Sequence, residues 1–186
     1  MILNRTWLFV GVVALQLGIV LYSPAKHALI RSQGREISLQ MAPVDPYSFM
    51  TGYSMDLSYV VSTPSNFPVN EAGTEGEVVA VLTVDKDNVG RPKALLRQMP
   101  RLAENEVALR GSFRRWGRIE YGIEKFYMPE TQREEISAEA NRAWGAPSGQ
   151  AQRPSPPVSK MRVNVRIGPD GEASLVRMHV NGHVYE

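Results

Sequence analysis

No feature constrains the fold of this chain more than the uncharged apolar run at residues 6–22. Gln16 is its only strongly polar side chain, and Trp7 and Tyr22 stand near its two ends. As a helix this run would be about 26 Å long, just short of the hydrocarbon core of a bilayer, which is about 30 Å thick. Aromatic residues at both ends suit the two membrane interfaces. The run therefore predicts one transmembrane helix.

Two other interpretations of this run compete with a permanent anchor. A cleaved signal peptide has a shorter apolar stretch with small residues before the cut, and Ser23-Pro24-Ala25 supplies those poorly. A buried helix of a soluble domain is disfavoured because the uncharged run is so long and lies at the start of the chain. We therefore predict an uncleaved signal-anchor within residues 1–25.

The flanking charges predict two opposite orientations. Arg5 precedes the run, whereas Lys26, Arg31 and Arg35 follow it, and on this count the positive-inside rule places the C-terminal side in the cytoplasm. A short head before an apolar run is instead typical of an exported domain. We prefer the second interpretation, which gives a single-pass protein of the cytoplasmic (inner) membrane with its main domain on the extracytoplasmic side.

The composition excludes several kinds of functional site. The chain has no cysteine, which excludes a disulfide scaffold, a thiolate zinc site and a cysteine nucleophile. It has three histidines, and 21 basic residues nearly balance 19 acidic ones. This near-balance argues against a nucleic-acid-binding protein. We expect no cofactor and no metal, and we disfavour an enzyme.

Alternating apolar and polar residues predict strands after the anchor. Residues 37–41 and 53–61 each have one apolar face, and residues 78–84 are apolar on both faces, as in a central strand. Further strands are predicted at residues 93–97, 107–109, 119–128, 160–167 and 173–180. A β-bulge near Glu124-Lys125 explains the change of buried face within residues 119–128.

One soluble helix and one linker interrupt the strands. Residues 130–144 carry early acidic residues and an apolar stripe at helical spacing, and residues 145–157 form a Pro-rich linker. The hairpin after the linker is too small to stand alone, so we expect it to return to the main sheet. The predicted fold is mainly β (α+β): an N-terminal transmembrane helix, then a β-rich antiparallel domain over residues 34–186 with one soluble helix.

Residues 43–59 carry a recognisable motif. Pro43, Asp45 and Pro46 form a Pro-Val-Asp-Pro sequence, and Gly52, Leu57 and Tyr59 follow in Gly-Tyr-Ser-Met-Asp-Leu-Ser-Tyr. The stretch resembles the GDYXXLXY family of membrane-anchored bacterial proteins. Tyr53 and Ser54 depart from the Asp and first Tyr of that motif, so no role of that Asp is transferred here.

The resemblance implies a partner rather than a reaction. Family members have no established activity, and they are often encoded beside a multi-pass membrane protein, which is the implied partner. From the residues alone the motif predicts a folding signature, because alternating apolar positions usually face a core. Buried in this way, the Tyr59 hydroxyl would need a hydrogen-bond acceptor.

Candidate chemical sites are sparse. Ser54 or Ser58 with Lys93 as general base would suit an anchored Ser/Lys-type hydrolase. His179 and His183 flank a predicted turn and lack a third ligand, so we interpret them as surface residues. Asp45 lies between prolines, where its carboxylate bonds nearby amides instead of forming a catalytic pair with Asp56.

A basic segment lies in the middle of the chain. It comprises Arg91, Lys93, Arg97, Arg101, Arg110, Arg114, Arg115 and Arg118. The segment suits anionic lipid headgroups or an acidic partner, but charge on strand edges also simply prevents edge-to-edge pairing.

Two functions follow as hypotheses. The first is a non-catalytic interaction or assembly partner of an integral membrane protein, held in the lipid bilayer through residues 6–22. The alternative is an anchored Ser/Lys-type hydrolase or small-ligand-binding module.

Overall fold

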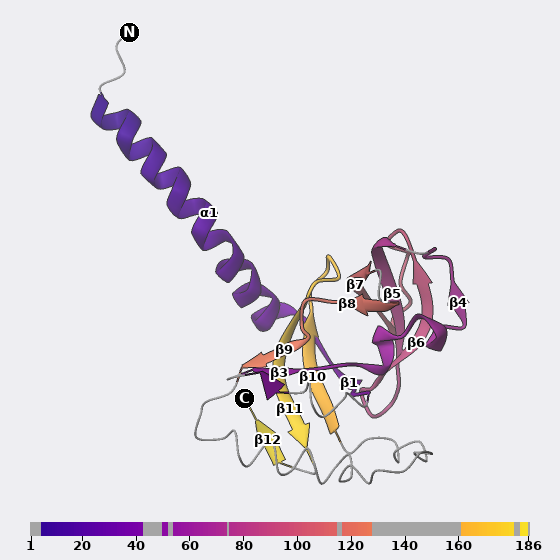
Figure 1. Cartoon of the computed structure of the whole chain (residues 1–186). Coiled ribbons are helices and arrows are strands. Elements are labelled where there is room, and N and C mark those ends of the chain that lie inside the picture. The colour runs from indigo at the N-terminus through magenta and orange to yellow at the C-terminus, as the bar shows by residue number, and fades with distance from the viewer. Residues whose placement is uncertain are drawn as a thin grey trace.

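The computed structural model describes residues 5–42, 50–51, 54–73, 75–114, 117–127, 161–180 and 183–185. One long helix, α1 (Arg5–Gln33), extends away from a β-rich domain (Figure 1). The predicted helix at residues 130–144, the linker at residues 145–157 and the motif residues Pro43, Asp45, Pro46 and Gly52 lie outside the described residues.

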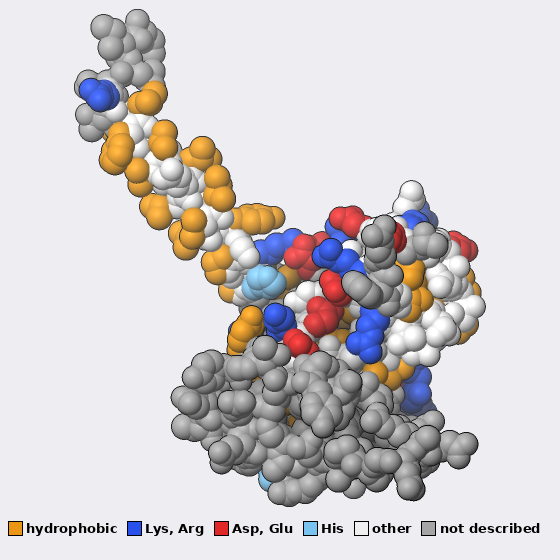
Figure 2. Space-filling view, viewed as in Figure 1, with side chains coloured by type: hydrophobic (Ala, Val, Ile, Leu, Met, Phe, Trp, Pro, Cys, Tyr) orange, Lys and Arg blue, Asp and Glu red, His pale blue; other side chains and the backbone are white. Residues whose placement is uncertain are grey.

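Helix α1 is longer than the predicted anchor. It continues through Pro24 and past residue 25, and it ends where the Gly34 amide donates to the Ile30 carbonyl oxygen at 2.8 Å. A side chain at position 34 would put its Cβ 2.5 Å from that oxygen, so glycine suits the exit from the helix. Trp7 is 71% and Ile19 67% exposed, and apolar side chains cover the visible face of the helix (Figure 2). By length and composition α1 can cross a membrane.

The described strands form three sheets. The first has the order β1 (Arg35–Gln40), β10 (Met161–Ile167), β11 (Ala173–Val180), β12 (His183–Tyr185). The second has the order β2 (Met50–Thr51), β3 (Ser54–Asp56), β9 (Lys125–Tyr127). The third has the order β4 (Val69–Asn70), β6 (Gly90–Leu96), β5 (Gly76–Val84), β7 (Glu106–Arg114), β8 (Arg118–Glu120). Neighbouring strands are antiparallel except β4 and β6, which are parallel.

The three sheets share one hydrophobic core. Ile37 and Leu39 of β1, Val165 of β10 and Leu82 of β5 are fully buried in one cluster with Met55 of β3. The alternation along β1 and β10 creates their inward faces, while β5 is buried at every residue from 78 to 82. The strands predicted at residues 37–41, 78–84, 93–97, 107–109, 160–167 and 173–180 are thus confirmed as β1, β5, β6, β7, β10 and β11, and β5 is central.

The prediction of a strand over residues 53–61 is largely wrong, but the prediction that its apolar side chains are buried is confirmed for the described residues. Strand β3 ends at Asp56, Tyr59 makes an isolated bridge to Met41, and a 3₁₀ turn, η1 (Val60–Ser62), follows. A second 3₁₀ turn, η2, spans Pro64–Asn66. The Leu57 amide donates to the Glu124 carbonyl oxygen, which lies outside the regular ladder. Leu57 and Tyr59 are nevertheless buried, because the core holds their side chains without a sheet.

The bulge predicted near Glu124-Lys125 is also wrong. The described part of this stretch, up to residue 127, forms two strands in different sheets, β8 and β9, separated by a turn at Gly122 with φ +79°. The turn redirects the chain, which changes the buried face without a bulge. The β10–β11 hairpin pairs with β1 instead of extending the sheet around β5. It thereby makes β1 part of a four-stranded sheet.

Candidate functional site

The end of α1 is fastened to the turn between β10 and β11. Lys26 Nζ lies 3.1 Å from Asp170 Oδ2 and also pairs with the Glu172 carboxylate. One turn later, Arg31 Nε donates to Ser174 Oγ at 3.0 Å. Ile30 is buried beside this turn, although most of α1 is exposed. We call these contacts the helix junction; they fix the direction in which α1 leaves the domain.

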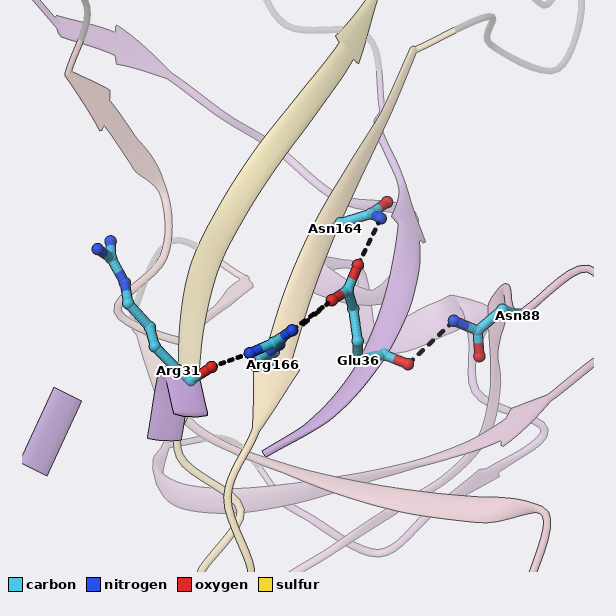
Figure 3. A network of polar contacts seen from close by, with 5 residues as sticks. All are labelled: Arg31, Glu36, Asn88, Asn164 and Arg166. Atoms are coloured by element: carbon cyan, nitrogen blue, oxygen red, sulfur yellow. Dashed lines mark hydrogen bonds and ion pairs between the residues drawn. The ribbon is translucent and has the colours of Figure 1, made fainter. Parts of the chain in front are cut away.

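A polar network continues the helix junction into the sheet (Figure 3). Glu36 of β1 accepts hydrogen bonds from Asn164 Nδ2 at 3.0 Å and from Arg166 Nε at 3.2 Å. Arg166 also donates to the carbonyl oxygen of Arg31, and Asn88 Nδ2 donates to that of Glu36 at 2.9 Å. The Asn164 and Arg166 hydrogen bonds outweigh partial burial and lower the pKa of Glu36. The network joins the last turn of α1 to β1, β10 and the β5–β6 turn.

The same turn also reaches the other large sheet. The Arg110 amide of β7 donates to the Gly171 carbonyl oxygen at 2.7 Å, and Arg35 Nη1 donates to the Glu104 carbonyl oxygen at 2.8 Å. Gly171 has φ +82°, and a Cβ there would lie 3.3 Å from the Ala108 carbonyl oxygen. The close approach therefore favours glycine. Through this turn α1 is coupled to both large sheets.

A pocket of about 610 Å³ lies beside the family-like motif. We call it the motif pocket. Its walls come from β3, β8, β9 and the segments that follow β3 and β8. They are Asp56, Leu57, Ser58, Ser62, Arg118, Ile119, Glu120, Gly122, Glu124, Lys125 and Tyr127. Among the described residues the Ser62 hydroxyl is buried and has no hydrogen-bond partner.

Two tyrosines brace the segments that line the motif pocket. Tyr59 donates its hydroxyl to the Ile123 carbonyl oxygen at 2.6 Å, and Tyr121 donates to the Val61 carbonyl oxygen at 2.5 Å. Burial, and secondarily the charge of Glu124, raises the pKa of both phenols. Both hydroxyls therefore stay protonated at neutral pH. The buried partner expected for Tyr59 is present.

Of the predicted Ser/Lys residues whose side chains the structure describes, Ser58 and Lys93 have different surroundings. Ser58 lines the motif pocket, but Lys93 lies on β6 and pairs with Glu106, whose pKa it lowers. Lys125 is the lysine in the pocket wall, and sequence reasoning did not select it. The Ser54 side chain lies outside the described residues.

The histidines stand on neighbouring strands. His179 lies on β11 and His183 on β12, where His183 is opposite Val180. In the part of the chain that the structure describes, no three His, Asp or Glu side chains gather as a metal site would require. Asp56 lines the motif pocket, whereas Asp45 lies outside the described residues.

The described residues of the basic segment lie on β6, β7 and β8 and in the stretch between β6 and β7, and several of them pair with acidic side chains. Arg91 pairs with Asp85 at 2.9 Å and Arg114 with Glu120 at 3.1 Å, in addition to the Lys93 pair. Arg97 donates to the Glu77 carbonyl oxygen at 3.2 Å. Arg101 and Arg110 are exposed, Arg118 lines the motif pocket, and Arg115 lies outside the described residues.

Sequence reasoning missed both the helix junction and Ser62. Lys26 and Glu172 are 146 positions apart, so no local pattern links them. Residues 168–171, Gly-Pro-Asp-Gly, are typical of a turn, but no local pattern indicates that Asp170 and Glu172 pair with Lys26.

Comparison with known protein families identifies the chain. The model of the GDYXXLXY protein family matches residues 16–178, which include the motif, part of α1, the whole sheet around β5, and β1, β10 and most of β11. The chain belongs to the GDYXXLXY family. Comparison with curated proteins and with solved structures gave no match. In this GDYXXLXY protein the Leu and last Tyr of the motif, Leu57 and Tyr59, are core residues, 4% and 0% exposed.

Proposed function

We propose that this GDYXXLXY protein is a membrane-anchored, non-catalytic interaction or assembly partner of an integral membrane protein. One observation carries the proposal: α1 leaves its apolar side chains exposed along its outer part, while its inner end is fastened to the β domain. A soluble protein would gain nothing from such a helix, since exposed apolar surface of this size favours aggregation. A bilayer would cover it.

The length of α1 fits this role. Residues 6–25 carry no charge and are helical, so the uncharged stretch is about 30 Å long, the thickness of a hydrocarbon core. Residues 26–33 add about 12 Å of helix beyond it. The β domain would therefore sit close to the membrane surface. A domain held there meets membrane proteins and headgroups before it meets anything else.

The helix junction supports an assembly role over a tethered catalyst. A flexible tether serves an enzyme that must reach soluble substrates, whereas a fixed mount presents one face of a domain to a neighbour. Lys26, Arg31 and the Glu36 network provide such a mount. As in the sequence-based preference, we place the domain on the extracytoplasmic side of the cytoplasmic membrane.

Two measurements on the full chain test the proposal. Protease added to intact spheroplasts should remove the β domain, and alkaline carbonate should leave the protein in the membrane pellet. Cross-linking in detergent extracts should then capture the same integral membrane protein in repeated experiments. Protection of the domain from protease would contradict the orientation. Release of the protein by carbonate would contradict the anchor, and recovery of the protein without a membrane partner would contradict the assembly role.

A second candidate function rests on the motif pocket. The Ser62 hydroxyl is buried and unpartnered among the described residues, although such a group destabilises a fold. A bound ligand with a hydrogen-bonding group would satisfy it. The walls carry both signs of charge, Lys125 and Arg118 against Asp56 and Glu120, which suits a small zwitterion.

Thermal shifts of the detergent-solubilised full chain against free amino acids and dipeptides test this candidate. Wild-type protein should be stabilised by at least one of these compounds, and Ser62→Ala should lose most of that stabilisation. Equal shifts in the two proteins, or no shift in wild type, would exclude the motif pocket as their binding site.

A further inference from the structure

Gln16 lies midway along the uncharged part of α1. It is 11 residues from Arg5 and 10 residues from Lys26, the charged residues that bound the stretch. At helical rise these separations are about 16 Å and about 15 Å. In the orientation across a bilayer on which our proposed function relies, Gln16 would therefore lie near the midplane. Its side chain is too short to reach either interface from there.

A carboxamide at that depth needs a partner. Hydrocarbon offers no donor or acceptor, so an unpaired amide in the bilayer core is costly and its presence indicates a contact. Gln16 is exposed, and α1 contacts the β domain only near the C-terminal end of the helix, around Lys26 and Arg31. Within the described residues, this chain has nothing that could pair with it. The partner must come from another transmembrane segment.

The neighbours of Gln16 form a uniform packing face. Residues three and four positions away share its side of the helix. In this chain they are Val12, Val13, Ile19 and Val20. All four are β-branched, so their side chains are already restricted in a helix and lose little freedom when they pack. We call this surface the Gln16 face.

We infer that α1 pairs with α1 of a second copy of this chain through the Gln16 face. The carboxamide carries both a donor and an acceptor, so two copies related by a two-fold axis satisfy each other: Nε2 of each donates to Oε1 of the other. No other residue type is required of the partner, and the flanking Val and Ile side chains pack identically from both sides. A polar residue within an apolar helical seam also fixes the register of the pair.

The pairing specifies the stoichiometry of the proposed assembly. Since the helix junction fixes each β domain to its helix, two paired helices would hold two β domains in a defined arrangement beside the membrane. An integral membrane partner would then meet a dimeric surface.

The absence of cysteine makes the test direct. Single cysteines replace Val12 or Val20 on the Gln16 face, and Gly11 or Gly18 on the opposite face, where an added Cβ meets nothing within 4 Å. Membranes that contain each full-length variant are oxidised, and disulfide-linked dimers are measured on gels. We expect dimers with Val12→Cys and Val20→Cys, and far fewer with Gly11→Cys and Gly18→Cys.

Substitution of Gln16 in the Val20→Cys background then tests the amide itself. Gln16→Leu should reduce the dimer about tenfold, the size expected for cross-helix hydrogen bonds in membranes, while Gln16→Asn should retain most of it. Equal cross-linking on both faces, stronger cross-linking at Gly18→Cys, no effect of Gln16→Leu, or cross-links solely to a different protein would each overturn the inference.

Carbonate extraction of the same membranes tests the anchor separately, by measuring whether the protein stays in the membrane pellet. If Val20→Cys and its Gln16→Leu derivative both stay in the pellet while Val20→Cys forms no disulfide-linked dimer, the pairing is wrong and the anchor stands. If Val20→Cys is extracted, the anchor is wrong and so is the pairing that depends on it.

Discussion

At the scale of single residues, the motif of this family contributes one buried hydroxyl, that of Tyr59, and one buried apolar side chain, that of Leu57, and Tyr121 outside the motif adds a second buried hydroxyl. Tyr59 and Tyr121 reach across to backbone carbonyl oxygens on each other's segment. Leu57 occupies the core beside them. These contacts close the segment that follows β3 against the segment that follows β8.

Tyr59→Phe should lower the free energy of unfolding by about 1–3 kcal/mol, because the Ile123 carbonyl oxygen would be left buried without its donor. Chemical denaturation of the full chain in detergent measures the change. Tyr127→Phe is the matched control, since Tyr127 is 73% exposed, and it should change stability little. An equal effect of both substitutions would contradict the role given to the Tyr59 hydroxyl.

Two buried serines should respond to alanine in opposite directions. Ser62→Ala removes a buried hydroxyl that has no partner among the described residues, and it should raise the free energy of unfolding by about 1 kcal/mol. Ser174→Ala should lower it, because the Ser174 hydroxyl accepts from Arg31 at the helix junction. The same denaturation experiment compares them. A loss of stability in Ser62→Ala would mean that the hydroxyl has a partner.

Glu36 predicts a dependence of stability on acid. Its pKa is lowered in the folded state by the Asn164 and Arg166 hydrogen bonds, so its charged form stabilises the fold above its unfolded pKa, near 4.5. That contribution is lost as the pH falls through the lower, folded value. Glu36→Gln should therefore flatten the acid limb of a stability–pH curve. Asp85 and Glu106 also have lowered pKa values, so part of the slope should remain. An unchanged slope would contradict the assignment.

At the scale of elements, the helix junction is the contact that no local pattern revealed. Lys26→Glu would place a carboxylate against Asp170 and Glu172, so α1 should swing relative to the β domain. Spin labels on cysteines introduced at Leu21 and Val184 should give a broader distance distribution than in the wild-type background. Adding Glu172→Lys restores an ion pair and should narrow it again. A distribution unaltered by Lys26→Glu would show that other contacts alone hold the helix.

For the strands, too, some features follow from the local sequence and others from distant segments. The alternation in β1, β10 and β11 was sufficient to predict those strands, because each has one face in the core. The same alternation predicted a strand over residues 53–61, but the observed strand, β3, has only three residues, Ser54–Asp56. There the side chains are buried as expected, but the backbone has a sheet partner only as far as Asp56. The alternation of apolar residues therefore predicts which side chains are buried, whereas strand pairing depends on whether another strand lies beside the backbone.

At the scale of the whole molecule, the last turns of α1 pack against the β domain. The predicted domain began at residue 34, yet Ile30 is buried and Lys26 and Arg31 bond to the β10–β11 region. A chain of residues 26–186 should melt several degrees above one of residues 34–186, since each 1 kcal/mol shifts the midpoint by roughly 2–4 °C at this size. Calorimetry of both fragments checks this. Equal melting temperatures would mean that residues 26–33 do not stabilise the β domain, which would then begin at residue 34.

The sequence by itself determined the local features of this protein. The uncharged run of α1, the two-sided burial of β5 and the core positions of Leu57 and Tyr59 all follow from the spacing of apolar residues. The family followed from the motif and was confirmed over residues 16–178.

Only the tertiary structure decided which distant segments meet. It paired β10 with β1, separated β8 from β9 into two sheets and fastened Lys26 to Asp170 and Glu172. It also buried the Ser62 hydroxyl in a pocket wall, with no hydrogen-bond partner among the described residues. The physical reason is that burial is encoded by each residue and its near neighbours, whereas ion pairs and strand partners depend on two positions far apart in the chain. The charge of Lys26 is visible in the sequence, but the carboxylates it meets are fixed by the folding of a hairpin more than a hundred residues away.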